Sequence, residues 1–437
     1  MKLRIEDVVG QCYDGASNMT GKEKGVAARV QEVAPKALYV HCYGHLLNLA
    51  LQDTLQENVV IRNALGVVQS IHHFFNSPKR EHVLRSVQMP ADFNSVPFIK
   101  LKSLSETRWA CRWEAVKAIE QQPERILLAL IQLSKDKDAK TSVDATGLVK
   151  AMLEFQFVLG LHTMKVIFSN TNSLASYLQG HEVDVMVAKA TCEATIKTLS
   201  KCREEEMFSL IWKKAQKTAK SISEIAPNME EVKTFKRQKK PSKRLQALLG
   251  ETPEVQPILF TDIQRGRIEV YYDALDRVLS EMKERFASRD TSILTSSADI
   301  VVGKATEESF KAVSNFYNID ADVLMGETAI FHNLENVNLK TANQVVNYLY
   351  TNSLDETLPH FTEVVTTLAA IPATSCSAER SFSCLRRLKT YLRSTMGQDR
   401  LSALGLLCIE RSHVNQVDIN TIIDIFGRRK GRDSMFF

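Results

Sequence analysis

Long hydrophobic runs are absent from this 437-residue sequence. The longest apolar stretches, such as Ile126 to Leu133 and Thr366 to Ile371, fall far short of the roughly 20 residues that a membrane-spanning helix needs. The chain also opens without the charged and then apolar leader of a secreted protein. We therefore expect a soluble, unsecreted protein with no membrane partner.

Paired cysteines and a strong charge imbalance are absent as well. The eight cysteines are scattered, without the spacing of a disulfide framework or a four-ligand zinc site, which is typical of buried thiols in a reducing compartment. The net charge of +5 is mild, so polyanion binding can be argued only from local clusters of charge. Hydrophobic residues make up 44% of the chain, enough for the cores of two or three domains.

The first sixty residues alternate strand and helix patterns. An apolar run from Ile5 leads to Asp14 and stops at Gly15, which predicts a strand with a carboxylate at its C-terminal end. Thr20 is the expected N-cap of a helix that ends by Pro35. A second strand and helix follow, at 38–40 and from 45. This order predicts a parallel or mixed α/β sheet, whose chemistry gathers at the carboxyl ends of its strands.

A long helical block is expected after the sheet. Glycine and proline are scarce between Trp109 and Phe286, which favours long helices joined by short loops. Apolar periodicity predicts helices at 63–75, 113–133 with a break at Pro123, 147–168, 184–202, 208–225 and 268–286. Residues 287–340 carry little periodic signal, and we expect a linker or peripheral structure there.

Positive charge clusters in one segment of this block. Residues Lys233 to Arg244 hold seven basic side chains and no acid, and a weaker basic tail lies at Arg428 to Arg432. Two interpretations are open: a solvated loop, or a nuclear-localisation or phosphate-contacting segment. The second interpretation makes four residues candidates for DNA contact, namely Lys236, Arg237, Lys239 and Lys240.

The C-terminal section carries two predicted helices. The first is capped by Thr374 or Ser375 and holds Glu379 in its opening turns, with an apolar stripe at Ala378, Phe382, Leu385, Leu388 and Leu392. The second, Leu401 to Ile409, is apolar almost all round. Such a helix is either deep core or part of a subunit interface. On the interface interpretation, the candidate dimerisation residues are Leu401, Leu404 and Leu407.

Three stretches of this sequence resemble the transposase-like proteins of the hAT superfamily, in particular zinc finger MYM-type 1-like proteins. One stretch is Cys12 to Met19 with Gly25-Val26 and Val40 to Leu49, another is Thr107-Arg108-Trp109, and the last is Ser377 to Ser383 with the leucine-rich helix after it. That last stretch is similar to the hAT C-terminal dimerisation region. Together, in this order, the three frame essentially the whole chain.

The resemblance implies an RNase H-like α/β fold interrupted by a large helical insertion. The corresponding divisions are 1–108 for the first part of the α/β domain, 109–340 for the insertion, and 341–437 for the final part with the dimerisation region. The family's three acids hold two divalent metals about 4 Å apart for phosphodiester transfer, and Mg²⁺ suits carboxylate and water ligands. Asp14 matches the second acid and Glu379 the third, so both are implied catalytic residues and metal ligands.

The first acid has no match in this sequence. The family carries it on an earlier strand, whereas only thirteen residues precede Asp14 here. Asp7, on the predicted Asp14 strand, would lie about 23 Å away in an extended chain and cannot substitute. The family's N-terminal zinc-binding finger has no match either. We therefore expect no catalysis and no cofactor, with Mg²⁺ relevant only if activity is retained.

Two further motifs, a CxxH pair and an Arg-Trp pair, can each be interpreted in two ways. Cys42 and His45 have CxxH spacing, but two ligands do not make a zinc site, and burial beside the sheet is favoured. In hAT enzymes this pair and the Arg-Trp pair, here Arg108 and Trp109, are structural features near the active site. The resemblance implies that Trp109 stacks on a nucleotide, worth about 1 to 3 kcal/mol per base, while a plain core tryptophan is the alternative.

The leading hypothesis is a hAT-derived nuclear protein without transposase activity, which homodimerises through its C-terminal region and binds DNA weakly, with no small-molecule substrate. The runner-up is an N-terminally truncated form of an active DDE-type DNA transposase. A third hypothesis is an interaction scaffold, in which the helical block from Trp109 to Phe286 is the surface that binds partner proteins.

Overall fold

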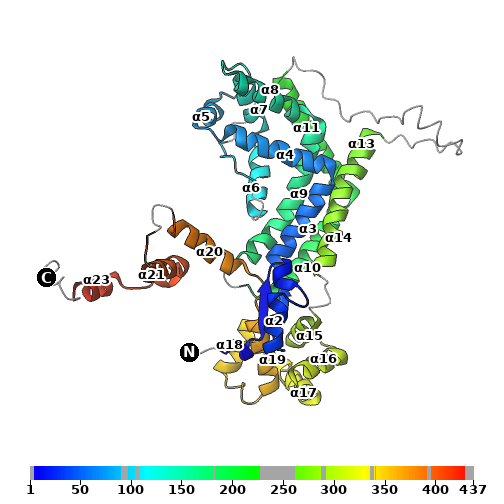
Figure 1. Ribbon diagram of the computed structural model, residues 1–437. Helices are drawn as coiled ribbons and strands as arrows, with labels where there is room; N and C mark the ends of the chain where they lie inside the picture. The colour runs from blue at the N-terminus through cyan, green and yellow to red at the C-terminus, as the bar shows by residue number, and fades with distance from the viewer. Residues whose placement is uncertain are drawn as a thin grey trace, which may run out of the picture. The chain divides into compact units, whose positions relative to one another are not determined.

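The computed structural model describes residues 4–89, 97–104, 109–180, 183–226, 261–286, 292–334, 339, 341–390 and 395–428. The chain divides into two compact units, Met1–Thr374 and Ser375–Phe437. Helices dominate the described parts of both units, so the expected large helical part is present (Figure 1). The three-part division at residues 108 and 340 stays a prediction.

A small parallel sheet lies near the start of the first unit. Strand β1 (Gly10–Tyr13) pairs with β2 (Leu38–His41), with Gly10 opposite Leu38 and Tyr13 opposite His41. Helices α1 (Ser17–Thr20) and α2 (Val26–Val33) connect the strands. The predicted order of strand, helix, strand and helix is therefore confirmed. Within the described residues the sheet has these two strands.

The start of the first strand was predicted wrongly. Ile5–Asp7 form the short 3-10 helix η1, and the strand begins only at Gly10. The Asp7 carboxylate accepts hydrogen bonds from Arg4 at 2.9 and 3.0 Å. Side chains three residues apart meet in a helical turn and not along a strand, so this pair favours the turn. Asp7 and Asp14 therefore do not share a strand.

The predicted cap at Thr20 is also wrong. Thr20 ends α1, and α2 begins at Val26 with Gly25 as its N-cap residue. The loop between them is too tight for side chains, because a Cβ on Gly25 would lie 2.5 Å from the Gly21 nitrogen. Two glycines thus set the start of α2.

Helices make up the rest of the first unit. The earlier set comprises α3 (Tyr43–Glu57), α4 (Val59–Phe75), α5 (Pro78–Ser86), α6 (Trp109–Glu120), α7 (Pro123–Leu133), α8 (Ala139–Leu153) and α9 (Phe155–Leu178). The later set comprises α10 (Val185–Lys201), α11 (Glu205–Ile225), α13 (Asp262–Arg265), the π-helical η2 (Gly266–Tyr272), α14 (Asp273–Phe286), α15 (Ser292–Val301), α16 (Glu307–Tyr317), α17 (Ala321–His332), α18 (Ala342–Thr351) and α19 (Pro359–Ala370). Apart from the corrections that follow, the predicted helices are present with shifted ends.

Helix α9 is the centre of the helical part. Its side chains are buried over most of its length, and it packs against α4, α6, α10 and α11. No single helix among the described residues is both long and apolar enough to cross a membrane, although α8 and α9, bent by 71°, have the length and composition together. A helix apolar on several sides is expected at the core of a large domain.

Two helical predictions need correction. The expected helix at 147–168 is two helices, because Glu154 takes an extended conformation between α8 and α9. Apolar residues flank Glu154 on both sides, so periodicity cannot detect this one-residue break. The expected linker at 287–340 contains α15, α16 and α17. These helices pack on one another and on α19, and the Lys36 ammonium donates to the Tyr317 carbonyl at 2.9 Å.

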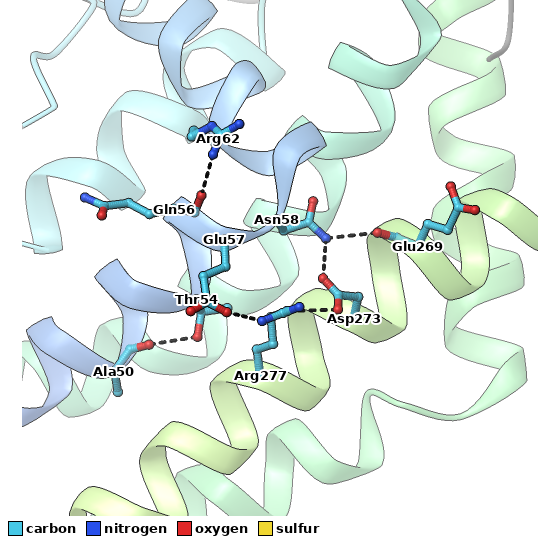
Figure 2. Close-up of polar contacts among 9 residues, drawn as sticks. All are labelled: Ala50, Thr54, Gln56, Glu57, Asn58, Arg62, Glu269, Asp273 and Arg277. Carbon is cyan, nitrogen blue, oxygen red and sulfur yellow. Dashed lines mark hydrogen bonds and ion pairs between the residues drawn. The ribbon is translucent and has the colours of Figure 1, made fainter. Parts of the chain in front are cut away.

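Asn58 fastens the junction of α3 and α4 to α14 and its π-helical start (Figure 2). Its Oδ1 accepts from the Ile61 N–H at 3.1 Å and caps α4, while its Nδ2 donates to the Glu269 carbonyl at 3.0 Å and to Asp273 at 2.7 Å. The Asp273 N–H donates to the carbonyls of residues 268 and 270, and not to the Glu269 carbonyl that lies between them in the sequence. Arg277 pairs with Asp273 and with Glu57.

The described part of the second unit holds four helices, which belong to the orange-to-red end of the chain in Figure 1. They are α20 (Cys376–Leu388), α21 (Gln398–Ile409), α22 (Arg411–Val414) and α23 (Ile419–Gly427). Helices α20 and α21 pack against each other. The predicted capping position is right, because Ser375 precedes α20.

Candidate functional site

Asp14 follows β1 directly, at the carboxyl end of the sheet as predicted. Its side chain is exposed, and its Oδ1 accepts from the Ala16 N–H at 3.4 Å. Gly15 lies against His41 at the end of β2, since a Cβ on Gly15 would sit 2.6 Å from the imidazole. This close approach explains the glycine after the acid. Locally, Asp14 has the contacts of a turn residue.

Cys42 and His45 follow the second strand, next to Asp14 in the fold. Cys42 is buried, and its Sγ lies 3.4 Å from the Thr374 hydroxyl. His45 is half-buried, and its ring stacks on that of His41, with centroids 5.7 Å apart. Burial lowers the pKa of His41. Across the described residues, no group of three or more His, Cys, Asp or Glu is arranged to hold a metal ion.

Glu379 lies in the first turn of α20, where its side chain is exposed and accepts from the Ser375 hydroxyl at 3.5 Å. An acid in this turn is favoured by the helix dipole alone. Asp14 belongs to the first unit and Glu379 to the second. The pairing of the two acids, and their role as metal ligands, therefore stay predictions.

The predicted DNA-binding residues fall largely outside the described residues. Arg108 and the four basic residues Lys236, Arg237, Lys239 and Lys240 belong to this group. Trp109 is the first residue of α6. Their roles stay predictions.

The predicted dimerisation residues differ in exposure. Leu401 is buried, Leu404 is half-buried and Leu407 is 52% exposed. Helix α21 thus buries Leu401 and leaves the apolar side chains near its C-terminal end exposed. We call the exposed apolar side chains of this helix pair the α20–α21 surface; they are Phe382, Leu385, Leu406, Leu407 and Ile409.

The predicted apolar stripe of α20 needs correction. Phe382 is 69% exposed and Ala378 is exposed, while the buried side chain of this helix's later turns is Cys384. The thiol of Cys408 on α21 hydrogen-bonds with that of Cys384, which raises the pKa of Cys384. Cysteine packs as a small hydrophobe, so the two thiols form part of the seam between α20 and α21.

Helix α23 was missed from the sequence. Asp418 caps it by accepting from the N–H groups of Asn420 and Thr421, each at 3.1 Å. The signal was present, because an N-cap acid followed by isoleucines at helical spacing predicts a short amphipathic helix.

Comparison with known proteins bears directly on this C-terminal part. Residues 331–412 match the hAT family C-terminal dimerisation region. This part of the chain is therefore similar to proteins of the hAT family. The match runs from the end of α17 into the first residues of α22, so it contains Glu379 and the α20–α21 surface.

Two relatives match over almost the whole chain. Each is named 52 kDa repressor of the inhibitor of the protein kinase; the human protein is 24% identical over 446 aligned positions and the mouse protein 25% over 452. In each alignment 97% of this chain is covered, but only 56% of the relative. The chain thus spans about half the length of these curated relatives.

Proposed function

We propose that this hAT-derived chain works as a homodimer held together by its C-terminal region, without catalysing DNA cleavage or strand transfer. The observation that carries the proposal is the coincidence of the matched dimerisation region with an exposed apolar surface. Each large aliphatic or aromatic side chain that becomes fully buried contributes about 1.5 to 3 kcal/mol. Most soluble homo-oligomers are twofold dimers in which the same surface meets itself.

The absence of catalysis is supported by two observations. The relatives carry the name of a repressor, and we transfer to this chain only the non-catalytic character that the name suggests. Asp14 is exposed in a tight turn, which explains its position without a metal. The RNase H-like arrangement, which would place Asp14 and Glu379 around Mg²⁺ in an active relative, is part of the proposal and fits the parallel order of β1 and β2.

Nuclear localisation and weak DNA binding complete the proposal. They rest on the seven basic residues of Lys233 to Arg244. Contacts with phosphates release counterions, so DNA affinity should fall steeply as salt rises. Binding to a random duplex that persists unchanged at high salt would contradict this part.

A second candidate function is a helical interaction scaffold. The observation that favours it is the continuous buried core of the helices around α9, together with a relative whose name concerns the control of another protein. A partner protein that binds equally well at low and high salt, in the absence of any DNA affinity, would support the scaffold over nucleic-acid binding.

The dimer is tested by light scattering on the full chain. Leu407→Asp places a charge on the α20–α21 surface and should give a folded monomer, because an unpaired charge is not tolerated in an apolar interface. The matched control is Leu210→Asp on α11, where the leucine is 46% exposed. It should leave the mass unchanged. A wild-type monomer, or a Leu407→Asp protein that stays dimeric, would contradict the proposal.

A further inference from the structure

Helix α23 carries an exposed apolar face outside the matched dimerisation region. With about 100° between successive residues, Ile419, Ile422, Ile423 and Phe426 lie on one side, and Ile425 borders them. Their exposed fractions run from 44% for Phe426 to 70% for Ile419. The polar residues of the helix share the opposite side. The apolar face thus covers more than a third of the helix circumference.

Such a helix needs a covering surface. Isolated helices shorter than about 12 to 15 residues are marginal in water, and most helical stability in proteins comes from packing of the apolar face. Isoleucine is also a weaker helix former than unbranched residues, because its side chain is restricted in a helix. Asp418 supplies a cap, but a cap alone does not offset five exposed apolar side chains. The nine residues of α23 therefore need a surface against which their apolar face can pack.

Continuity along the chain favours a second copy as the occupant. The matched dimerisation region ends at residue 412, and six residues separate it from Ile419. Six residues reach at most about 20 Å, so α23 starts close to that region. Helices α20 and α21 of the same unit also expose apolar side chains.

The size of the apolar surface supports the same occupant. A standard interface buries about 800 Å² per partner. Half-exposed large side chains each offer on the order of 100 Å², so the ten exposed side chains of α20, α21 and α23 together offer a comparable area.

We infer that the apolar face of α23 packs against a second copy of this chain and extends the dimer interface beyond residue 412. The inference rests on the proposed homodimer. In a twofold dimer both copies contribute the helix, so a substitution on its face acts twice.

The test measures the dimer dissociation constant of the full chain by sedimentation. Ile423→Asp should raise that constant by roughly a hundredfold or more, because the charge is buried twice without a partner. Asn420→Asp is the matched control, since it adds the same charge to the polar side of the same helix. It should leave the dissociation constant within about threefold.

Hydrogen exchange on the unmodified protein gives a second readout that does not depend on a variant's folding. The amides of α23 should exchange more slowly at concentrations above the dissociation constant than below it. Amides of α9, in the core of the first unit, should not change with concentration.

The outcomes separate this inference from the proposed dimer. A wild-type monomer overturns both. If Leu407→Asp gives a monomer while Ile423→Asp leaves the dissociation constant unchanged, and α23 exchanges equally at all concentrations, the dimer stands and the inference fails. If Ile423→Asp instead lowers the melting temperature of the dilute monomer without weakening the dimer, α23 packs on its own chain, and the inference fails as well.

Discussion

The two units of the chain bury their apolar residues to very different extents. In the first unit, a connected set of buried side chains runs from Leu38 to Ala373. In the described part of the second unit, the buried apolar side chains are Cys376, Cys384 and Leu401, while ten large apolar side chains on α20, α21 and α23 are exposed. Both units form helices with good apolar periodicity. Periodicity alone therefore does not tell whether a helix face meets its own chain or another.

The difference has a physical meaning. A unit of about sixty residues buries only about 60% of the surface that its unfolded chain exposes, less than a larger domain does, and is marginal by itself. An exposed apolar face favours association, because its burial is the main favourable term in protein assembly. The second unit is thus the part whose stability should depend on a partner, and the first unit the part that should not.

The largest expected contrast comes from one leucine in each unit. Leu130→Ala in α7 removes a fully buried side chain and should lower the free energy of unfolding by about 2 to 5 kcal/mol. Leu406→Ala in α21, where the leucine is 64% exposed, should change it by less than about 0.5 kcal/mol in dilute protein and weaken the dimer instead. Urea unfolding at low concentration measures both. Equal losses would mean that the second unit has a core of its own.

Helix caps give a second contrast. Asn58→Ala removes the cap of α4 and the donors to Glu269 and Asp273, and should cost about 3 kcal/mol of global stability. Asp418→Ala removes the cap of α23 and should speed amide exchange only in that helix. Urea unfolding and hydrogen exchange measure the two effects. Global destabilisation by Asp418→Ala would show that α23 is part of the main folding unit.

The pH dependence of stability should come partly from His162 in the first unit. Burial lowers the pKa of His162 to about 4, against 6.5 for the unperturbed group. The imidazole is 3.0 Å from the Thr218 hydroxyl and 3.7 Å from Glu120. Below pH 6.5 the unfolded chain binds a proton that the folded chain does not, so stability falls until about pH 4.

At pH 5 this loss is about 2 kcal/mol relative to pH 7.5. In His162→Gln the amide can still bond to Thr218, but it does not titrate. The difference in unfolding free energy between the wild type and His162→Gln should therefore change by about 2 kcal/mol between pH 7.5 and pH 5. A constant difference would mean that His162 titrates normally in the folded chain.

The smallest expected effect concerns Asp14. Asp14→Asn should change stability by less than about 0.5 kcal/mol, because the carboxylate is exposed and makes one long hydrogen bond. Millimolar Mg²⁺ should raise the melting temperature of neither protein. A Mg²⁺-dependent rise in the wild type that Asp14→Asn abolishes would indicate a metal site and contradict the non-catalytic proposal, since a ligand stabilises the state that binds it.

Sequence patterns were sufficient where local chemistry decides structure. The strands that end near Asp14 and begin at Leu38, the long helices, and the start of α20 after Ser375 all follow from residue type and spacing. They were insufficient where distant contacts decide. Glu154 interrupts an unbroken apolar pattern, and α15 is rich in serine, yet its Leu294 and Ile300 are buried by neighbouring helices.

The C-terminal part shows the same limit at the level of function. The apolar composition of Leu401 to Ile409 indicated core or interface, and only the fold distinguishes buried Leu401 from exposed Leu407. The resemblance of Ser377 to Ser383 to the hAT superfamily agrees with the match of residues 331–412 to the hAT dimerisation region. It gave no information about α23, which lies beyond the matched region.

The most direct measurement is the mass of the unmodified chain by sedimentation equilibrium, over concentrations from nanomolar to tens of micromolar. We predict a reversible shift from the monomer mass of 49.2 kDa to twice that value. The apolar surfaces of α20, α21 and α23 would then be covered by a second copy. A single species of 49.2 kDa at every concentration would contradict the account, because the second unit would then be stable without its dimer.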